Sequence, residues 1–276
     1  MNHVVLPPHV SLAHLTALEA RPTELVHAAA DAGFRQIGLR LLKDSRFPEE
    51  PDHDPGPAGS AGFRRLQDAL RSRGVSVLDV EVIRLWPDTD LATFLPLLEK
   101  GATLGASRAL LLSNDPDRTR NADRIAGLAE AALPLGIDIC VEFVAYNAIR
   151  SFTEAADIIE ESGARNARLL IDTLHFCRAG GDLSELCTPR GQLVSYVQIC
   201  DGPATPPADL LPEGRSNRLF PGEGGLPLHE ILDALPRDLP LSVEVPNVAL
   251  AATACVSERA SRAAAAMRTF LAQRSH

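Results

Sequence analysis

The feature that most constrains this chain is a regular alternation of short apolar or β-branched stretches with helical patterns. The expected strands lie within His3–Leu12 and at Arg35–Arg40, Val75–Val82, Ala109–Ser113, Ile137–Glu142, Arg168–Asp172, Leu193–Gln198 and Leu239–Glu244. The expected helices are Pro22–Gly33, Phe63–Arg73, Asp90–Leu104, Ala122–Leu135, Thr153–Gly163, Leu183–Pro189, Leu228–Leu235 and Ser257–Gln273. Strands separated by helices pair in parallel, and eight such units in roughly 250 residues are typical of a (β/α)8 barrel. We therefore predict an α/β protein with one domain, a single (β/α)8 TIM barrel over residues 1–276.

Two long segments without a predicted element interrupt the alternation. One runs from Lys43 to about Gly59 and the other from Asp201 to Leu226, and both are rich in Pro and Gly. The length of the first is typical of an active-site or interface loop, or of local disorder. At the helix ends, Gly33 is an expected stop and Thr153 an expected N-cap.

The last four predicted strands each stop at an oxygen-bearing side chain, namely Glu142, Asp172, Gln198 and Glu244. A buried carboxylate is costly unless it is paired or bound to a metal. Active sites of such barrels lie at the carboxyl ends of the strands, and consecutive strands bring these four side chains toward one point. We predict that they share a divalent cation. Because every ligand offers oxygen, Mn²⁺ or Mg²⁺ is favoured over Zn²⁺. The competing interpretations are loop ion pairs for the carboxylates and a hydrogen-bonded core amide for Gln198.

The composition of the chain disfavours some classes of binding partner. The net charge is −9 and the isoelectric point about 5.4, which disfavours binding to nucleic acid. No apolar run reaches the roughly 18 residues of a membrane span, and the N-terminus lacks the pattern of a signal peptide. The five cysteines form no CxxC pair, which fits reduced thiols in a cytoplasmic enzyme. We expect a small-molecule substrate, no nucleic acid and no membrane. The oligomeric state stays open, although apolar loops and helices of such barrels often pair into homo-oligomers.

At the strand-end ligands the chain resembles a known family. The matching segments are Val141-Glu142-Phe143, Ile171-Asp172-Thr173-Leu174-His175, Val197-Gln198-Ile199-Cys200-Asp201-Gly202, Arg218-Leu219-Phe220-Pro221-Gly222-Glu223-Gly224 and Ser242-Val243-Glu244-Val245-Pro246. They resemble the sugar-phosphate isomerase/epimerase group of xylose-isomerase-like TIM barrels. Its relatives include ketose 3-epimerases, inosose dehydratases, 3-dehydroshikimate dehydratases and endonuclease IV. The resemblance covers most of the chain from Gly33 onward and is not specific for a substrate.

The resemblance implies roles for single residues at the metal. Glu142, Asp172 and Glu244 match metal ligands, and Glu142 and Glu244 match residues that are also acid/base groups in epimerases. The fourth ligand is usually His, whereas Gln198 stands here, a departure shared by some dehydroshikimate dehydratases. His175 completes the family's Asp-x-x-His, in which the His contacts a substrate oxygen; a helix-capping role is the alternative.

The resemblance also suggests substrate-binding residues. Arg218 precedes the Pro-Gly-Glu-Gly turn, near which an Arg of relatives holds a substrate oxygen or carboxylate. Arg215 is its rival, and a surface salt bridge is the alternative. Glu81 resembles a position that binds substrate in several relatives, and Arg40 and Arg84 also lie near strand ends.

These observations favour an enzyme. A divalent cation polarises a carbonyl and an adjacent hydroxyl, and two carboxylates can remove and return a proton. We expect a metal-dependent isomerase or epimerase that acts on a ketose or related polyol through an enediolate. The alternative is a dehydratase (lyase) of the 3-dehydroshikimate or inosose type. A barrel that binds a sugar or a partner without turning it over is a third interpretation. A DNA-repair role is disfavoured, because relatives with that role use a trinuclear site with additional His ligands that these strand ends lack.

Overall fold

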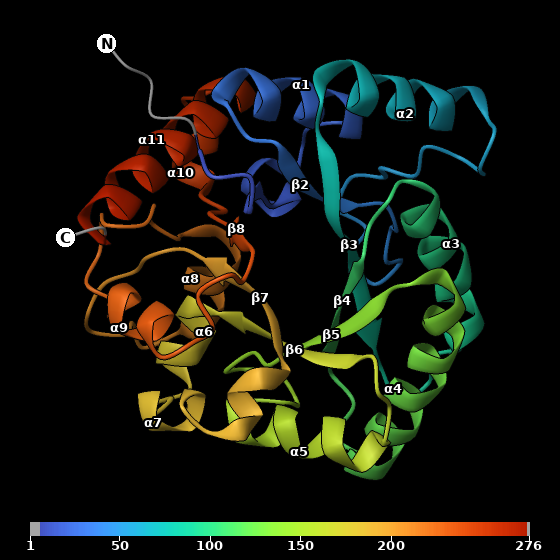
Figure 1. Ribbon diagram of the computed structural model, residues 1–276, viewed down its shortest axis with the longest axis vertical. Coiled ribbons are helices and arrows are strands. Elements are labelled where there is room, and N and C mark those ends of the chain that lie inside the picture. Colours follow the sequence, from blue (N-terminus) through green and yellow to red (C-terminus); the bar gives the residue numbers. More distant parts are fainter. Residues whose placement is uncertain (1–5, 275–276) are drawn as a thin grey trace.

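Eight parallel strands close into a barrel in the computed structural model, which describes residues 6–274. Figure 1 shows the strands at the centre of the molecule. Their order around the ring is β1 to β8. The expectation that the first strand begins as early as His3 falls partly on residues 3–5, outside the described residues. The strands are β1 Val10–Leu12, β2 Gln36–Arg40, β3 Ser76–Leu85, β4 Arg108–Ser113, β5 Asp138–Glu142, β6 Ala167–Asp172, β7 Val194–Ile199 and β8 Leu241–Val243. β1 pairs with β8 as well as with β2, so the sheet has no open edge.

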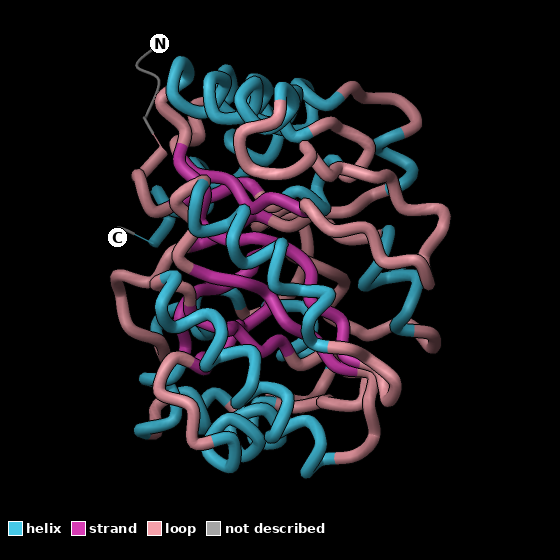
Figure 2. Tube along the Cα trace, turned by 90° about the vertical axis from the view of Figure 1, so that its right-hand side faces the viewer, coloured by secondary structure: helices cyan, strands magenta, loops and turns pink. Residues whose placement is uncertain are grey.

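Helices surround the barrel, and in the side view of Figure 2 the strands lie between them. The longest, α11, packs against α1, so the last helix of the chain lies beside the first α-helix (Figure 1). The α-helices are α1 Pro22–Ala32, α2 Ala61–Arg73, α3 Leu95–Thr103, α4 Arg118–Ala132, α5 Phe152–Ser162, α6 Thr173–Arg178, α7 Leu183–Leu186, α8 Leu210–Ser216, α9 Leu228–Asp233, α10 Val248–Ala251 and α11 Val256–Arg274. Short 3₁₀ segments are η1 His14–Ala17, η2 Leu91–Phe94, η3 Leu133–Leu135 and η4 Pro189–Leu193. The predicted (β/α)8 barrel is thus confirmed.

Some details differ from the sequence-based expectations. The hydroxyl of Ser151 accepts the backbone N–H of Glu154 and caps α5, so Thr153 is not the N-cap but lies inside the helix. The segment between Asp201 and Leu226 is not wholly a loop, since it contains α8. Asp172 is followed at once by α6, which the sequence analysis did not predict.

The barrel interior holds both an apolar cluster and buried polar side chains. A small apolar cluster, separate from the layer between strands and helices, consists of Leu78, Val82, Leu110, Cys140, Leu170 and Tyr196. Elsewhere in the barrel Ser11, Asp79, Glu81 and Ser242 are buried. The Tyr196 hydroxyl donates to Oδ2 of Asp79 at 3.3 Å. A Cβ added to Gly38 would lie 2.9 Å from Oδ1 of Asp79 and 2.9 Å from Oε1 of Glu81, so two buried carboxyl oxygens converge over this glycine.

The cysteines and the helix lengths bear on two further expectations. All five cysteines are free; Cys140 and Cys200 are buried and Cys187 and Cys255 exposed. Within residues 6–274, no helix combines the length and apolar character that crossing a membrane requires.

Candidate active site

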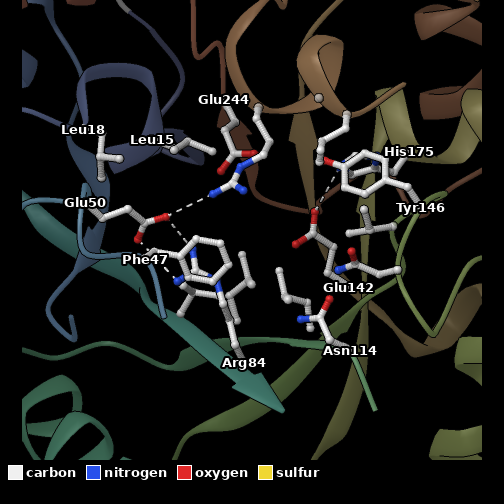
Figure 3. A pocket seen from close by; sticks show the side chains of 18 of the residues that line it. Leu15, Leu18, Phe47, Glu50, Arg84, Asn114, Glu142, Tyr146, His175 and Glu244 are labelled. Carbon is white, nitrogen blue, oxygen red and sulfur yellow. Dashed lines mark hydrogen bonds and ion pairs between the residues drawn. The ribbon is translucent and has the colours of Figure 1, made fainter. Parts of the chain in front are cut away.

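A cavity of about 650 Å³ opens at the carboxyl ends of the strands. Its walls come from strand ends, from the loop 43–59 after β2, from the loop after β5 and from α8. Figure 3 shows Glu142 and His175 on one side of this cavity and Glu50 on the other. The cavity therefore joins the predicted metal ligands to a part of the chain that the strand pattern did not single out.

Of the four predicted metal ligands, Glu142 and Glu244 line this cavity, whereas Asp172 and Gln198 are buried behind its lining. Glu142 and Asp172 are the last residues of β5 and β6, Gln198 is the second-last residue of β7, and Glu244 directly follows β8; all four are buried. Glu142, Asp172 and His175 each offer a ligand atom within 4.8 Å of the others. Two carboxylates and an imidazole at this spacing are a possible metal centre.

The amide of Gln198 has a fixed orientation. Its Nε2 donates to Oε1 of Glu244 at 2.8 Å. Its Oε1 is buried and has no hydrogen-bond partner within residues 6–274. A buried carbonyl oxygen without a partner is costly, and coordination of a hard cation would satisfy it. The donor set therefore fits a divalent metal with oxygen ligands.

Arg218 supplies positive charge among these carboxylates. Its Nη1 lies 2.5 Å from Oδ2 of Asp172 and 3.0 Å from Oε2 of Glu244. With only 2 % of its surface exposed, Arg218 is not a surface residue, which rules out a surface salt bridge. The other oxygen of Asp172, Oδ1, accepts the backbone N–H groups of Leu174 and His175 and caps α6.

A glycine-rich turn holds Arg218 in place. The carboxylate of Asp201 accepts the backbone N–H groups of Gly202, Gly222, Gly224 and Leu226. Asp201 also pairs through its backbone with Leu219, the residue after Arg218. A Cβ on Gly224 would lie 2.3 Å from the carbonyl oxygen of Gly202, so this position requires glycine. The Pro-Gly-Glu-Gly segment thus positions the arginine.

His175 is buried between Arg218, Glu142 and Tyr146. Its Nε2 lies 3.4 Å from Nη2 of Arg218 and 4.0 Å from Oε1 of Glu142, and its ring meets that of Tyr146 edge-on at 5.4 Å. Burial lowers the pKa of His175 to about 4; the charge of Arg218 acts in the same direction, whereas Asp172 opposes it. The imidazole is therefore neutral at pH 7 and can donate or accept a hydrogen bond.

The carboxyl groups of the site hold protons to different degrees. Burial raises the pKa of Glu142 well above its usual value, and repulsion from Asp172 and Glu244 adds to the shift. Burial also raises the pKa of Glu244, to about 8, although Arg218 opposes the shift. Burial acts on Asp172 too, but Arg218, His175 and the hydrogen bonds to its oxygens outweigh it and lower its pKa. Such separated pKa values are a frequent property of acid/base pairs.

The remaining predicted substrate residues are placed differently. Arg40 lines the cavity, whereas Glu81 is fully buried beside it, with Oε2 3.4 Å from Nη2 of Arg40. Sequence reasoning missed Glu50 and Phe47 on the loop 43–59 and Tyr146 after β5, all of which line the cavity. The signal for the first two was the length of that loop.

Residues 26–273 match the family model of the xylose isomerase-like TIM barrel, and the chain belongs to this family. It is 30% identical over 117 residues to the inosose isomerase of Bacillus velezensis, covering 42% of this chain and 41% of that protein. It is 31% identical over 130 residues to the 3-dehydroshikimate dehydratase of Pseudomonas aeruginosa, covering 46% of this chain and 20% of that protein. The matches thus span less than half the length of these curated relatives. Among solved structures, the IolI protein with a bound zinc atom matches with a TM-score of 0.80 at 19% identity, over 96% of this chain and 98% of that one; this likeness concerns the fold.

Proposed function

We propose that this member of the xylose isomerase-like TIM barrel family is a divalent-metal-dependent isomerase or epimerase that acts on a ketose or related polyol through an enediolate. The observation that carries the proposal is the meeting of two protonatable carboxyl groups, Glu142 and Glu244, at one cavity wall beside the ion-paired Asp172. The similarity to an inosose isomerase supports the same reaction class.

Glu142, Asp172, Gln198 and Glu244 would hold the metal. All four offer oxygen, so Mn²⁺ or Mg²⁺ is our proposed ion. Such an ion supplies polarisation of a substrate carbonyl and its neighbouring hydroxyl, which lowers the cost of removing a proton from carbon. The unpartnered Oε1 of Gln198 supports this ligand set.

The protein groups have distinct tasks in this proposal. Glu142 and Glu244 come from β5 and from the end of β8, and one removes the carbon-bound proton while the other returns a proton. Arg218 and the neutral His175 donate hydrogen bonds to substrate oxygens and orient the substrate. Return of the proton to the neighbouring carbon gives isomerisation, and return to the opposite face of the same carbon gives epimerisation.

A dehydratase is the second candidate. The same enolate can expel a β-hydroxyl group instead of being reprotonated. Arginines around Glu50 on the far side of the cavity favour this interpretation, because a carboxylate-bearing cyclic ketone would find cationic partners there. The similarity to a 3-dehydroshikimate dehydratase points to the same class.

A substrate panel in D₂O with added Mn²⁺ tests the proposal. Ketoses, inososes and 3-dehydroshikimate are incubated with the protein, and products are followed by NMR and mass spectrometry. Deuterium exchange without loss of water supports an isomerase or epimerase, and loss of water supports the dehydratase. Stoichiometric metal with binding but no exchange on any substrate would instead indicate a barrel that binds without turnover.

A further inference from the structure

The far side of the cavity is built from three arginines that surround one glutamate. Glu50, on the loop 43–59, has its Oε1 2.9 Å from Nη2 of Arg84 and 3.6 Å from Nη2 of Arg215. Its Oε2 lies 3.3 Å from Nη1 of Arg84 and 3.4 Å from Nη1 of Arg40. Arg84 therefore holds this carboxylate with both terminal nitrogens, the fork geometry in which a guanidinium recognises a planar carboxylate.

Two of these guanidinium groups lie over the ring of Phe47. The central carbon of the Arg84 guanidinium lies 4.4 Å from the centre of the Phe47 ring, and that of Arg215 lies 4.8 Å from it. Phe47 thus contacts both guanidinium groups while they face Glu50, so these arginines are in position before a ligand arrives. Arg40, Phe47, Glu50, Arg84 and Arg215 all line the same cavity as Glu142 and Glu244, so a ligand in that cavity can reach both ends.

The charges around Glu50 allow its carboxylate to be replaced by one carboxylate from a ligand. Besides Glu50, Asp44 lies 3.6 Å from Arg84 and Glu81 lies 3.4 Å from Arg40. Without the carboxylate of Glu50, three guanidinium groups would face two carboxylates. Burial raises the pKa of Glu81, so the arrangement keeps an excess of positive charge that a substrate carboxylate can meet.

We propose that Glu50 occupies the place of a substrate carboxylate, and that the substrate carries a carboxylate group at the end that Arg40, Arg84 and Arg215 bind. This inference rests on the proposed function, because it takes the cavity as the substrate site. In the bound state the substrate carboxylate replaces Glu50 between Arg84, Arg40 and Arg215. The side chain of Glu50 then turns away from the arginines, while Phe47 and Asp44 on the same loop keep their contacts with Arg84.

Binding to metal-free protein tests this subsite separately from the reaction. Chelator-treated protein is titrated calorimetrically with cyclohexanecarboxylate, with its neutral analogue cyclohexanecarboxamide and with inorganic phosphate. We expect Glu50→Gln to bind cyclohexanecarboxylate about tenfold or more tightly than the wild type, because the internal competitor is lost. The carboxamide should bind weakly to both. Glu160→Gln is the matched control. It removes the carboxylate of an exposed residue of α5 that pairs with Arg190, and it should leave binding unchanged.

The partly exposed Arg215 gives a second variant that does not depend on burying an altered side chain. Arg215→Gln should weaken cyclohexanecarboxylate binding about tenfold, alone or combined with Glu50→Gln. Unchanged affinity in Glu50→Gln, equal binding of the carboxamide, or preferential binding of phosphate would each overturn the inference. Carboxylate binding of the expected kind without turnover of any substrate in the panel would refute the proposed reaction and leave the subsite standing. Turnover confined to uncharged substrates would support the proposed reaction and refute the carboxylate subsite.

Discussion

Nη1 of Arg218 lies 2.5 Å from Oδ2 of Asp172, and neither side chain has appreciable contact with solvent. The same nitrogen lies 3.0 Å from Glu244. A guanidinium thus contacts two of the oxygen groups that would hold the proposed metal. Two cations near the same carboxylates repel each other, and the arginine must share or yield these oxygens when the ion binds.

The first prediction concerns this competition. Arg218→Gln should bind Mn²⁺ about tenfold or more tightly than the wild type when no substrate is present, because the competing charge is gone. Isothermal titration of the metal-free proteins measures the affinity, with the surface variant Arg190→Gln as control. On an identified substrate, Arg218→Gln should raise KM more than it lowers kcat. Weaker Mn²⁺ binding by the variant would argue that the arginine assists the metal.

The second prediction concerns proton transfer. Glu142→Gln and Glu244→Gln each keep an oxygen donor but lose the base, and loss of a general base typically costs about 10²–10⁴ in rate. Each variant should therefore lower kcat by that order while metal content, measured by elemental analysis, stays stoichiometric. Near wild-type turnover with full metal in both variants would move the proton transfer to His175 or another cavity residue.

The third prediction is that metal affinity rises with pH. The raised pKa of Glu244, about 8, means that its carboxyl group carries a proton at pH 6 in the metal-free protein. A ligand must be deprotonated to bind the ion, so release of the Glu244 proton should raise Mn²⁺ affinity by up to about tenfold per pH unit between pH 6 and 8, and the raised pKa of Glu142 should add to this slope. Titrations in buffers of different ionisation enthalpy measure the protons released. The slope should become shallower in Glu244→Gln, and an unchanged slope would assign the proton to another group.

The fourth prediction concerns Asp79 inside the barrel. Burial, together with repulsion from Glu81 and Glu244, raises the pKa of Asp79 well above its usual value. The folded state therefore retains a proton that the unfolded state releases above about pH 4, so the stability that depends on Asp79 falls as pH rises. Asp79→Asn removes this dependence. The variant should gain free energy of unfolding relative to the wild type between pH 5 and 8, by at most about 1.4 kcal/mol per pH unit.

Urea unfolding at several pH values measures this gain, with the exposed Asp68→Asn as control. An equal effect of Asp79→Asn at every pH would show that Asp79 is not the group that keeps the proton.

The fifth prediction concerns metal selectivity. Gln198→His replaces an oxygen donor with a nitrogen donor and should shift the preference toward Zn²⁺. Dialysis against equimolar Zn²⁺ and Mn²⁺, followed by elemental analysis, gives the ratio of bound metals. Gln192→His places the same residue type at an exposed position and should leave the ratio unchanged. An unaltered ratio in Gln198→His would remove Gln198 from the ligand set.

Features that depend on residues close together in the sequence could be predicted, and features that depend on residues far apart could not. A strand that stops at a carboxylate carries its own pattern, so the convergence of Glu142, Asp172 and Glu244 could be inferred once eight units were counted. α8 was missed because Pro212 and Gly214 are typical of loops, although Pro is tolerated in the first turn of a helix. The partners of Glu50 lie far from it in sequence, so their meeting became visible only in three dimensions.

The mixture of apolar and buried polar side chains inside the barrel has a consequence for protein engineering. Leu78, Leu110 and Leu170 belong to an apolar cluster in which exchanges that conserve volume are usually tolerated. At Gly38 even one added methyl group would press on two buried carboxyl oxygens. Directed evolution toward new substrates should therefore recover accepted changes mainly from this apolar cluster, and few at Gly38 or the two carboxyl groups that face it. New specificities should therefore arise by substitutions in one part of the barrel interior, because the side chains that line the interior tolerate change there and not near Gly38.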